Sequence, residues 1–353
     1  MDRILVISLS GIGDTLMATP LCHELRRQYP RAHIEALVLW KGARQVLLGN
    51  PHVDEVHQHD FLGGSRTGSI AFCLRLRKRR YDLSINTHTQ GRRGYRVIAR
   101  LIGARERLSH EYENQGWPDR LLVTRSCPQD YGLHAMENNL RLLERIGLRP
   151  TDPDPRYEVF LEPSERDWAA RWCAENTGGE GRMLGIHVGS GGTKNLALRR
   201  WPLENWAGLL RALPSVLPGI RPVLFGGPEE AALHAELRRS GVAFQEAKTS
   251  TLREAMALVA RCAGFISVDT VFMHVAAAME VPRQWVIETP TLNPPVHPRR
   301  RDWIRIPNPG VGGRPLDFYR YDGRDIAGSP DELRRIMRSV TVDDVLESLR
   351  RAL

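Results

Sequence analysis

Near the N-terminus, a short apolar run ends in Gly11-Ile12-Gly13-Asp14, a turn that carries a carboxylate. Residues 4–9 are typical of a β-strand, and apolar residues at helical spacing follow the turn, so this stretch predicts strand, tight loop and helix. Open α/β sheets build their sites at the carboxyl ends of strands. At such a place Asp14 is either a helix cap or a general base, and this stretch taken alone favours the cap.

A second polar stretch, Gly189 to Lys194, follows an expected strand at 183–188. Its small residues, among them Ser190 and Thr193, could expose backbone N–H groups as an anion nest, with Lys194 or Arg199 supplying positive charge. The order of residues is not that of a P-loop. A flexible surface loop explains the same composition equally well.

Two further turns carry acidic residues. Glu230 ends a glycine-rich turn after the expected strand 221–225, where it could accept hydrogen bonds from ribose hydroxyls or simply favour the start of a helix. Asp269 and Thr270 begin an expected helix over 269–279, and His274 lies one turn later on the same face. A cap at Asp269 and a structural His274 are the plain alternatives.

Strands and helices alternate around these turns. The pattern predicts a doubly wound, mostly parallel α/β sheet in each half of the chain. The proline-rich residues 149–155 indicate a domain boundary. We therefore expect two Rossmann-like domains, at 1–155 and 156–353, with a ligand-binding cleft between them. Residues 110–131 and 288–330 show little periodicity, and the first of these is expected to be a loop.

Composition narrows the class of protein. The 353 residues are 42% hydrophobic and 26% charged, which is typical of a globular chain. No apolar run approaches the ~18–20 residues that span a bilayer, and no signal-peptide pattern opens the chain, so we expect a cytoplasmic protein. The five cysteines form no Cys-x-x-Cys pair and the histidines do not cluster, which argues against a disulfide framework and a structural zinc site.

The net charge of +9 indicates an anionic partner: nucleic acid, an anionic membrane face or a phosphorylated small molecule. Arginines concentrate at 75–80 and at 92–100, where Arg92 and Arg93 stand together. Their planar guanidinium groups suit phosphate recognition, although a solvated helix face would look the same. Nucleic-acid binding rests on charge alone, because no helix-turn-helix, RRM, KH or zinc-finger signature is present, and we expect none.

A dinucleotide-binding fingerprint is incomplete. Gly11 and Gly13 fit its first two glycines, and Glu35 could serve as the ribose acceptor, but Leu16 occupies the place of the third glycine. A nicotinamide oxidoreductase is therefore disfavoured.

Taken together, the motifs resemble one family, the ADP-heptose:lipopolysaccharide heptosyltransferases of glycosyltransferase family 9, which have a GT-B fold. The resemblance extends from the N-terminus to about residue 282. The motifs that carry it are, in order, Gly-Ile-Gly-Asp14 with Thr19-Pro20, Gly49-Asn-Pro-His-Val-Asp54, Arg200-Trp201-Pro202, Phe225-Gly-Gly-Pro-x-Glu230, and Asp269-Thr270 with His274-x-Ala-Ala-Ala.

The resemblance implies an inverting, metal-independent sugar transfer with a nucleotide sugar, ADP-heptose, as co-substrate and no other cofactor. The acceptor is a lipopolysaccharide core or another anionic cell-envelope saccharide. It binds the N-terminal domain, where Asp14 is the general base. The implied acceptor-binding residues are Gly11, Gly13, Arg92 and Arg93. The implied donor-binding residues, in the C-terminal domain, are Ser190, Thr193, Lys194, Arg199, Glu230, Asp269, Thr270 and His274. The basic helices would suit a glycolipid at the cytoplasmic face of the inner membrane, and the C-terminal helices could pack back on the N-terminal domain.

The chain departs from the family pattern at two places. Val271 stands where the family has glycine after Asp-Thr, and Ile287 to Thr291 replace a Phe-Gly-Pro-Thr turn. These departures leave two alternatives open. One is a GT-B transferase that uses another nucleotide sugar, and the other is a non-catalytic relative that binds a nucleotide or a glycolipid.

Overall fold

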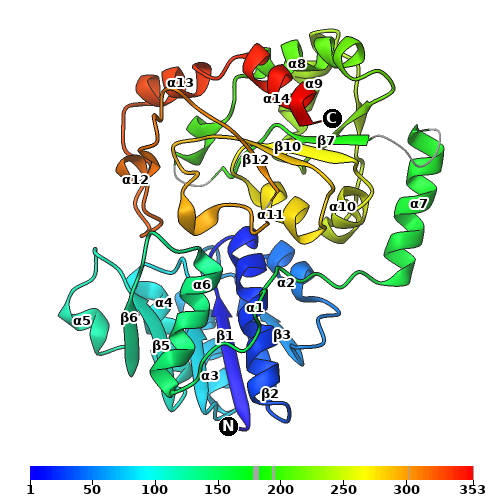
Figure 1. Ribbon diagram of the computed structural model, residues 1–353. Helices are drawn as coiled ribbons and strands as arrows, with labels where there is room; N and C mark the ends of the chain where they lie inside the picture. The colour runs from blue at the N-terminus through cyan, green and yellow to red at the C-terminus, as the bar shows by residue number, and fades with distance from the viewer. Residues whose placement is uncertain (178–182, 193–194, 301, 353) are drawn as a thin grey trace. The chain divides into compact units, whose positions relative to one another are not determined.

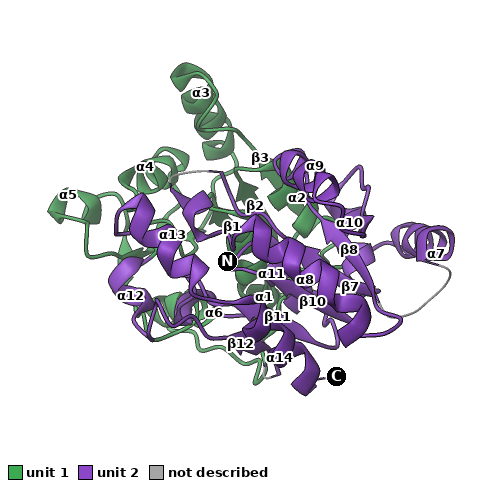
Figure 2. Cartoon of the chain, turned by 90° about the horizontal axis from the view of Figure 1, so that it is seen from above, with its two compact units in different colours: residues 1–160, 321–324 green, residues 161–320, 325–353 purple. Residues whose placement is uncertain are grey.

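The computed structural model describes residues 1–177, 183–192, 195–300 and 302–352. The chain forms two compact units, Met1–Phe160 with Tyr321–Arg324, and Leu161–Arg320 with Asp325–Leu353 (Figure 2). The proline-rich segment at 149–155 thus belongs to the first unit, and the chain leaves that unit five residues after the boundary that we expected. A four-residue segment near the C-terminus also joins the first unit.

The first unit contains a parallel six-stranded sheet in the order β3-β2-β1-β4-β5-β6 (Figure 1). Its strands are β1 (Arg3–Ser8), β2 (His33–Val38), β3 (Glu55–Gln58), β4 (Leu83–Asn86), β5 (Glu106–Glu111) and β6 (Arg125–Pro128). Its helices are α1 (Ile12–Gln28), α2 (Lys41–Leu47), α3 (Arg66–Arg77), α4 (Arg93–Ile102), α5 (Trp117–Arg120) and α6 (Ala135–Arg141), with the 3-10 turn η1 (Leu142–Ile146). Helix α1 contacts α2 and α6, whereas α3 contacts α4.

Strands β5 and β6 correct our expectation of a loop at 110–131. Polar residues dominate β5, so its sequence lacks the apolar alternation of a strand. Ser109 and His110 are nevertheless buried, and the buried guanidinium of Arg96 donates a hydrogen bond to the His110 carbonyl oxygen. Hydrogen bonding therefore holds this strand where hydrophobic patterning does not predict it.

The second unit repeats the topology with a parallel sheet in the order β12-β11-β10-β7-β8-β9 (Figure 1). Its strands are β7 (Met183–His187), β8 (Arg221–Phe225), β9 (Gln245–Glu246), β10 (Gly264–Ser267), β11 (Gln284–Ile287) and β12 (Ile304–Ile306). Its helices are α7 (Pro163–Thr177), α8 (Leu203–Val216), α9 (Ala231–Arg239), α10 (Leu252–Val259), α11 (Val271–Ala278), α12 (Pro315–Phe318), α13 (Pro330–Arg338) and α14 (Val342–Ala352), with the 3-10 turns η2 (Leu196–Arg199) and η3 (Pro294–Val296). Two Rossmann-like α/β units were predicted, and this prediction is confirmed.

The C-terminal helices complete the core of the second unit. Helix α14 packs on α8 and β12, and α13 packs on η2. The buried indole N–H of Trp201 donates to the carbonyl oxygen of Val340, in the turn between α13 and α14, at 2.8 Å. Apolar residues of these two helices join the core cluster that contains Trp206 and Trp285.

In each sheet the strand order reverses once, between β1 and β4 in the first unit and between β7 and β10 in the second. Ligands of open α/β sheets bind outside the carboxyl ends of the strands at this switch point. The structure therefore directs attention to the residues that follow these four strands. No helix among the described residues has the length and apolarity needed to cross a membrane, and all five cysteines are free and buried.

Candidate functional site

Asp14 lies at the switch point of the first sheet, in the first turn of α1. Its Oδ2 accepts a hydrogen bond from the backbone N–H of Gly11 at 2.6 Å, and its Oδ1 accepts one from Thr89 Oγ1 at 3.1 Å. Thr89 belongs to the loop after β4, and Ser10 Oγ donates to the Thr89 carbonyl oxygen at 2.9 Å. The carboxylate thus does cap α1, as the simpler interpretation held, while it stands half-buried between the ends of β1 and β4.

The two glycines before Asp14 both have ordinary backbone conformations. Neither has a positive φ: Gly11 is extended with φ −75°, and Gly13 is the second residue of α1. A Cβ at Gly11 would come within 3.0 Å of Asp14 Oδ2. Glycine is therefore suited to this position because the carboxylate approaches the backbone closely, and no left-handed turn is needed.

The paired arginines at the start of α4 differ in their surroundings. Arg93 donates from Nε and Nη2 to the two carboxylate oxygens of Asp119, at 2.9 and 3.2 Å. Arg92 is exposed and forms no ion pair with any described residue. Of the two predicted acceptor-binding cations, Arg92 is consequently the one whose charge remains available, since Arg93 is neutralised by α5.

In the second unit, Arg199 and Asp269 form a buried ion pair at the switch point. Arg199 Nη1 lies 3.2 Å from Asp269 Oδ2 and 3.2 Å from Thr291 Oγ1, and Thr291 Oγ1 donates to the same Asp269 oxygen at 2.7 Å. The Nε–H of Arg199 is shielded from solvent and has no hydrogen-bond partner among the described residues. A guanidinium with an unfilled donor is suited to bind an anionic ligand.

Glu230 follows β8 and is buried beside the end of β7. Its Oε2 accepts a hydrogen bond from the backbone N–H of Gly227 at 2.8 Å, and burial raises the pKa of its carboxyl. A Cβ at either Gly189 or Gly226 would overlap the Glu230 side chain. Two strand-end glycines therefore make room for one carboxylate.

His187 at the end of β7 connects Glu230 to Thr270. Its Nδ1 lies 3.1 Å from Thr270 Oγ1, and its Nε2 lies 3.8 Å from Glu230 Oε1. Burial, with the neighbouring His234, Arg200 and Arg199, lowers the pKa of His187 to about 3. The imidazole is therefore neutral near pH 7 and acts here as a hydrogen-bonding group.

Four predicted donor-binding residues remain, and the structure describes two of them, Ser190 and His274. Ser190 Oγ accepts a hydrogen bond from Arg200 Nε at 3.0 Å and donates to the Leu196 carbonyl oxygen at 3.1 Å. His274 is buried on α11, and burial lowers its pKa to about 4. Thr193 and Lys194 lie outside the described residues.

The structure also identifies site residues that the sequence analysis missed. Thr291 contacts both members of the buried ion pair, His187 links Thr270 to Glu230, and Arg200 holds Ser190. The available signals were weak: His187 lies within the expected strand 183–188, Arg200 stands beside the predicted cation Arg199, and Thr291 lies four residues after the end of β11. Glu35, considered above as a ribose acceptor, is instead the third residue of β2 and bonds to Tyr81 at 2.5 Å, away from the carboxyl end of the strand.

Comparisons with known proteins identify the family of the chain. The family model described as "Glycosyltransferase family 9 (heptosyltransferase)" matches residues 70–283, more than half of the chain. The chain is 26% identical to lipooligosaccharide heptosyltransferase 2 of Haemophilus ducreyi, over 83% of this chain and 86% of that protein. It is 27% identical to lipopolysaccharide heptosyltransferase 3 of Escherichia coli K12, over 76% and 78% of the two chains.

Solved structures show the same fold. A family 9 glycosyltransferase of Veillonella parvula matches with a TM-score of 0.78 at 20% identity, covering 99% of this chain and 96% of that one. The E. coli ADP-heptose lipopolysaccharide heptosyltransferase II matches with a TM-score of 0.73 at 20% identity, covering 99% and 98%. The two Rossmann-like units therefore correspond to the GT-B fold, and the chain belongs to glycosyltransferase family 9 and is a glycosyltransferase.

Proposed function

We propose that this glycosyltransferase moves a heptose from ADP-heptose to a lipopolysaccharide core or another cell-envelope saccharide, with inversion at the anomeric carbon and without a metal ion. The relatives at 26–27% identity are named lipooligosaccharide and lipopolysaccharide heptosyltransferases. The observation that carries the proposal is the buried Arg199 guanidinium at the carboxyl end of the second sheet, whose Nε–H has no hydrogen-bond partner in the described part of the chain.

In this proposal the second unit binds the donor. The leaving nucleoside diphosphate gains negative charge as the sugar departs, and fixed cations and N–H dipoles stabilise that charge. Arg199, held by Asp269 and Thr291, would contact the phosphates. Glu230, with its buried carboxylate, would accept hydrogen bonds from the ribose hydroxyls. Ser190, Thr193, Lys194, Thr270 and His274 complete the proposed donor site.

The first unit supplies the base. An acceptor hydroxyl oxygen forms the new bond to the anomeric carbon on the face opposite the nucleotide, and the bond from that carbon to the phosphate oxygen breaks. The hydroxyl proton passes to the Asp14 carboxylate, and the nucleoside diphosphate leaves with the bonding electrons. The backbone at Gly11 and Gly13 and the available charge of Arg92 would position the acceptor, with Arg93 contributing less because Asp119 binds it.

The α3 surface would hold the enzyme at an anionic membrane where a glycolipid acceptor resides. Three large apolar side chains on and before α3 are exposed: Leu62 by 63%, Ile70 by 46% and Leu74 by 45%. Five exposed cations, Arg66, Arg75, Arg77, Lys78 and Arg80, accompany them, and residues 61–80 contain no acidic residue. Apolar insertion combined with basic charge is the pattern of a peripheral contact with anionic lipids.

Thermal unfolding with ADP, UDP, GDP and CDP at matched concentrations tests the proposed donor. A ligand at 100 times its Kd stabilises a protein by about 2.7 kcal/mol, which is readily measured as a rise in Tm. We expect ADP to raise Tm and the other three nucleotides to have little effect. A rise with another nucleotide instead would overturn the ADP-heptose donor in favour of a different nucleotide sugar. A Tm unchanged by all four would favour the non-catalytic alternative.

A further inference from the structure

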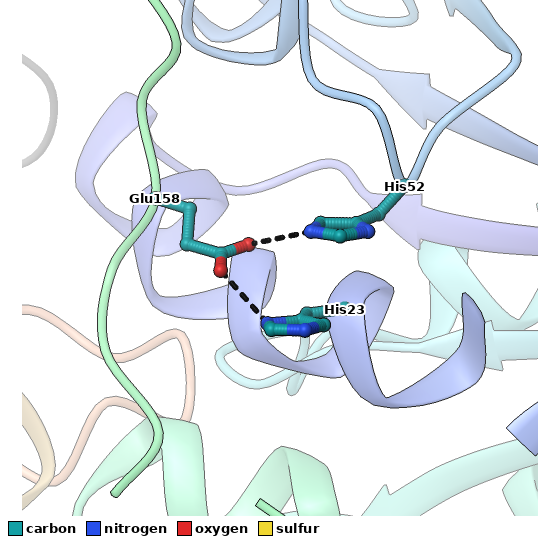
Figure 3. Close-up of side chains that lie close together, drawn as sticks. All are labelled: His23, His52 and Glu158. Atoms are coloured by element: carbon teal, nitrogen blue, oxygen red, sulfur yellow. Dashed lines mark ion pairs between the residues drawn. The ribbon is translucent and has the colours of Figure 1, made fainter. Parts of the chain in front are cut away.

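Three potential metal ligands from distant parts of the chain meet in the first unit, and the proposed reaction uses none of them. His23 lies on α1, His52 follows α2, and Glu158 lies in the segment that leads out of the unit (Figure 3). His23 Nδ1 is 2.8 Å from Glu158 Oε1, and His52 Nε2 is 3.4 Å from Glu158 Oε2. The ligand atoms of all three residues lie within 4.8 Å of one another.

The backbone around this cluster is fixed by its own hydrogen bonds. The N–H of Glu158 donates to Thr19 Oγ1 at 2.9 Å, and Thr19 lies one helical turn before His23 on α1. The N–H of His52 donates to Asn50 Oδ1 at 2.8 Å. Ligands held in this way lose less conformational freedom when they bind an ion than ligands on mobile segments do.

The cluster also leaves polar atoms unsatisfied. Glu158 Oε2 and His52 Nδ1 are shielded from solvent and have no hydrogen-bond partner among the described residues. Burial raises the pKa of Glu158, whereas burial and the neighbouring His23 lower the pKa of His52 to about 4. A cation bound here would give Glu158 Oε2 the partner that it lacks among the described residues.

We propose that His23, His52 and Glu158 bind a divalent transition-metal ion, with Zn²⁺ as the expected occupant. Two imidazole nitrogens and one carboxylate form a ligand set that Zn²⁺ accepts, and water would fill the fourth position. The three side chains are 27%, 17% and 20% exposed, so an ion in solution can reach them.

Binding requires a small rearrangement of the two rings. The imidazoles of His23 and His52 are stacked, with centroids 4.2 Å apart and planes 4° from parallel. A metal ion lies near the plane of each ring that binds it, so one ring must rotate out of the stack. Around a tetrahedral zinc with bonds of about 2.0–2.1 Å, the ligand atoms are about 3.3–3.5 Å apart. Here the two nitrogen–oxygen pairs are 2.8 and 3.4 Å apart, and all ligand atoms lie within 4.8 Å of one another.

The site is separate from the proposed catalytic base. His23 follows Asp14 by nine residues on the same helix, which corresponds to about 13.5 Å along its axis. The ion would therefore fasten α1 and the 50–54 turn to the segment around Glu158. A ligand that binds only the folded unit raises its stability by mass action.

Metal-binding measurements on the full-length protein test this proposal. The protein is stripped with a chelator, and Zn²⁺ binding is then measured by calorimetry and Co²⁺ binding by visible absorption. The variants are His52→Gln and Glu158→Gln, with His59→Gln as the matched control. His59 is a half-buried imidazole of the same unit that stacks on Phe72 at 4.4 Å, outside the cluster.

We expect wild type and His59→Gln to bind one Zn²⁺ per chain, to raise Tm with Zn²⁺, and to give the intense absorption of low-symmetry Co²⁺. The two cluster variants should bind Zn²⁺ at least about tenfold more weakly. Absence of Zn²⁺ binding to the wild type at micromolar concentrations would overturn the proposal without reference to any variant. Equal binding by Glu158→Gln, folded as judged by circular dichroism, would overturn it as well.

Discussion

Replacement of Arg199 by methionine separates the structural role of this residue from its proposed role in donor binding. Arg199→Met keeps the length of the side chain and removes the guanidinium. Buried Asp269 then loses its partner at 3.2 Å, while Thr291 still donates to the same oxygen at 2.7 Å. Breaking a buried pair by removing one member costs about 3–5 kcal/mol, and the remaining Thr291 contact places our expectation near the lower end, about 3 kcal/mol.

A second variant, Arg199→Met with Asp269→Asn, removes the charge of the Asp269 carboxylate as well. Replacing both members of a buried ion pair is often close to neutral. We therefore expect the double variant to recover most of the lost stability. It should not recover ADP binding, because the cation proposed to contact the phosphates is still absent.

Tryptophan fluorescence during urea unfolding measures the stability of the relevant unit. Six of the eight tryptophans lie in the second unit, and Trp201, Trp206 and Trp285 are fully buried in its core. ADP affinity is measured in parallel by calorimetry. A double variant that regains both stability and ADP affinity would refute the assignment of Arg199 as a phosphate contact. An Arg199→Met protein as stable as wild type would refute the energetic importance of the buried pair.

Three further predictions follow from other contacts. Glu230→Gln should weaken ADP binding about tenfold, as calorimetry would measure, because an amide is a poorer acceptor for ribose hydroxyls; unchanged affinity would contradict the ribose contact. Against the effect of burial, the partners His57, Tyr81 and Arg79 lower the pKa of Glu35 to about 2. Ionised Glu35 should therefore contribute about 3 kcal/mol to the free energy of unfolding above pH 4.5, and this contribution should be lost as the pH falls toward 2. The stability gap between wild type and Glu35→Gln should therefore shrink below pH 4.5, and a gap independent of pH would argue against this coupling. Replacement of Leu62, Ile70 and Leu74 by serine in one variant should abolish sedimentation of the protein with phosphatidylglycerol vesicles. The control is Trp117→Ser, which changes an exposed tryptophan on α5. Equal losses of vesicle binding in both variants would contradict a specific α3 contact.

The repeated strand–helix pattern was sufficient to predict the fold class. Residues 221–225 and 284–287 have the apolar, β-branched composition of buried strands, and the structure places β8 and β11 there. Strand β12 is only three residues long and lies in a proline- and arginine-rich stretch, so no periodicity can reveal it. Its existence depends on pairing with β11, a tertiary contact that a local window does not contain.

In the candidate site, too, local sequence patterns predicted some residues, while others are recognised only from tertiary contacts. Glycine turns after strands indicated where Asp14 and Glu230 would stand, and the start of a helix directly after a strand indicated Asp269, because strand ends in a parallel sheet share one edge. Thr291 could not be recognised in this way, since its contact with Arg199 joins residues 92 positions apart. The cluster of His23, His52 and Glu158 is a stronger example, because its members are scattered in the sequence and meet only in the folded unit.

The most direct test of the proposed function is sugar transfer by wild type and Asp14→Asn. Purified protein is incubated with ADP-heptose and a heptose-deficient core saccharide, and mass spectrometry follows the acceptor while ADP release is quantified. Asparagine can still accept the hydrogen bond from Gly11, so the variant should fold and bind ADP normally. We predict that wild type adds one heptose to the acceptor and that Asp14→Asn lowers kcat by about 10²–10⁴-fold. Equal turnover by both proteins, or no transfer by wild type, would contradict the account.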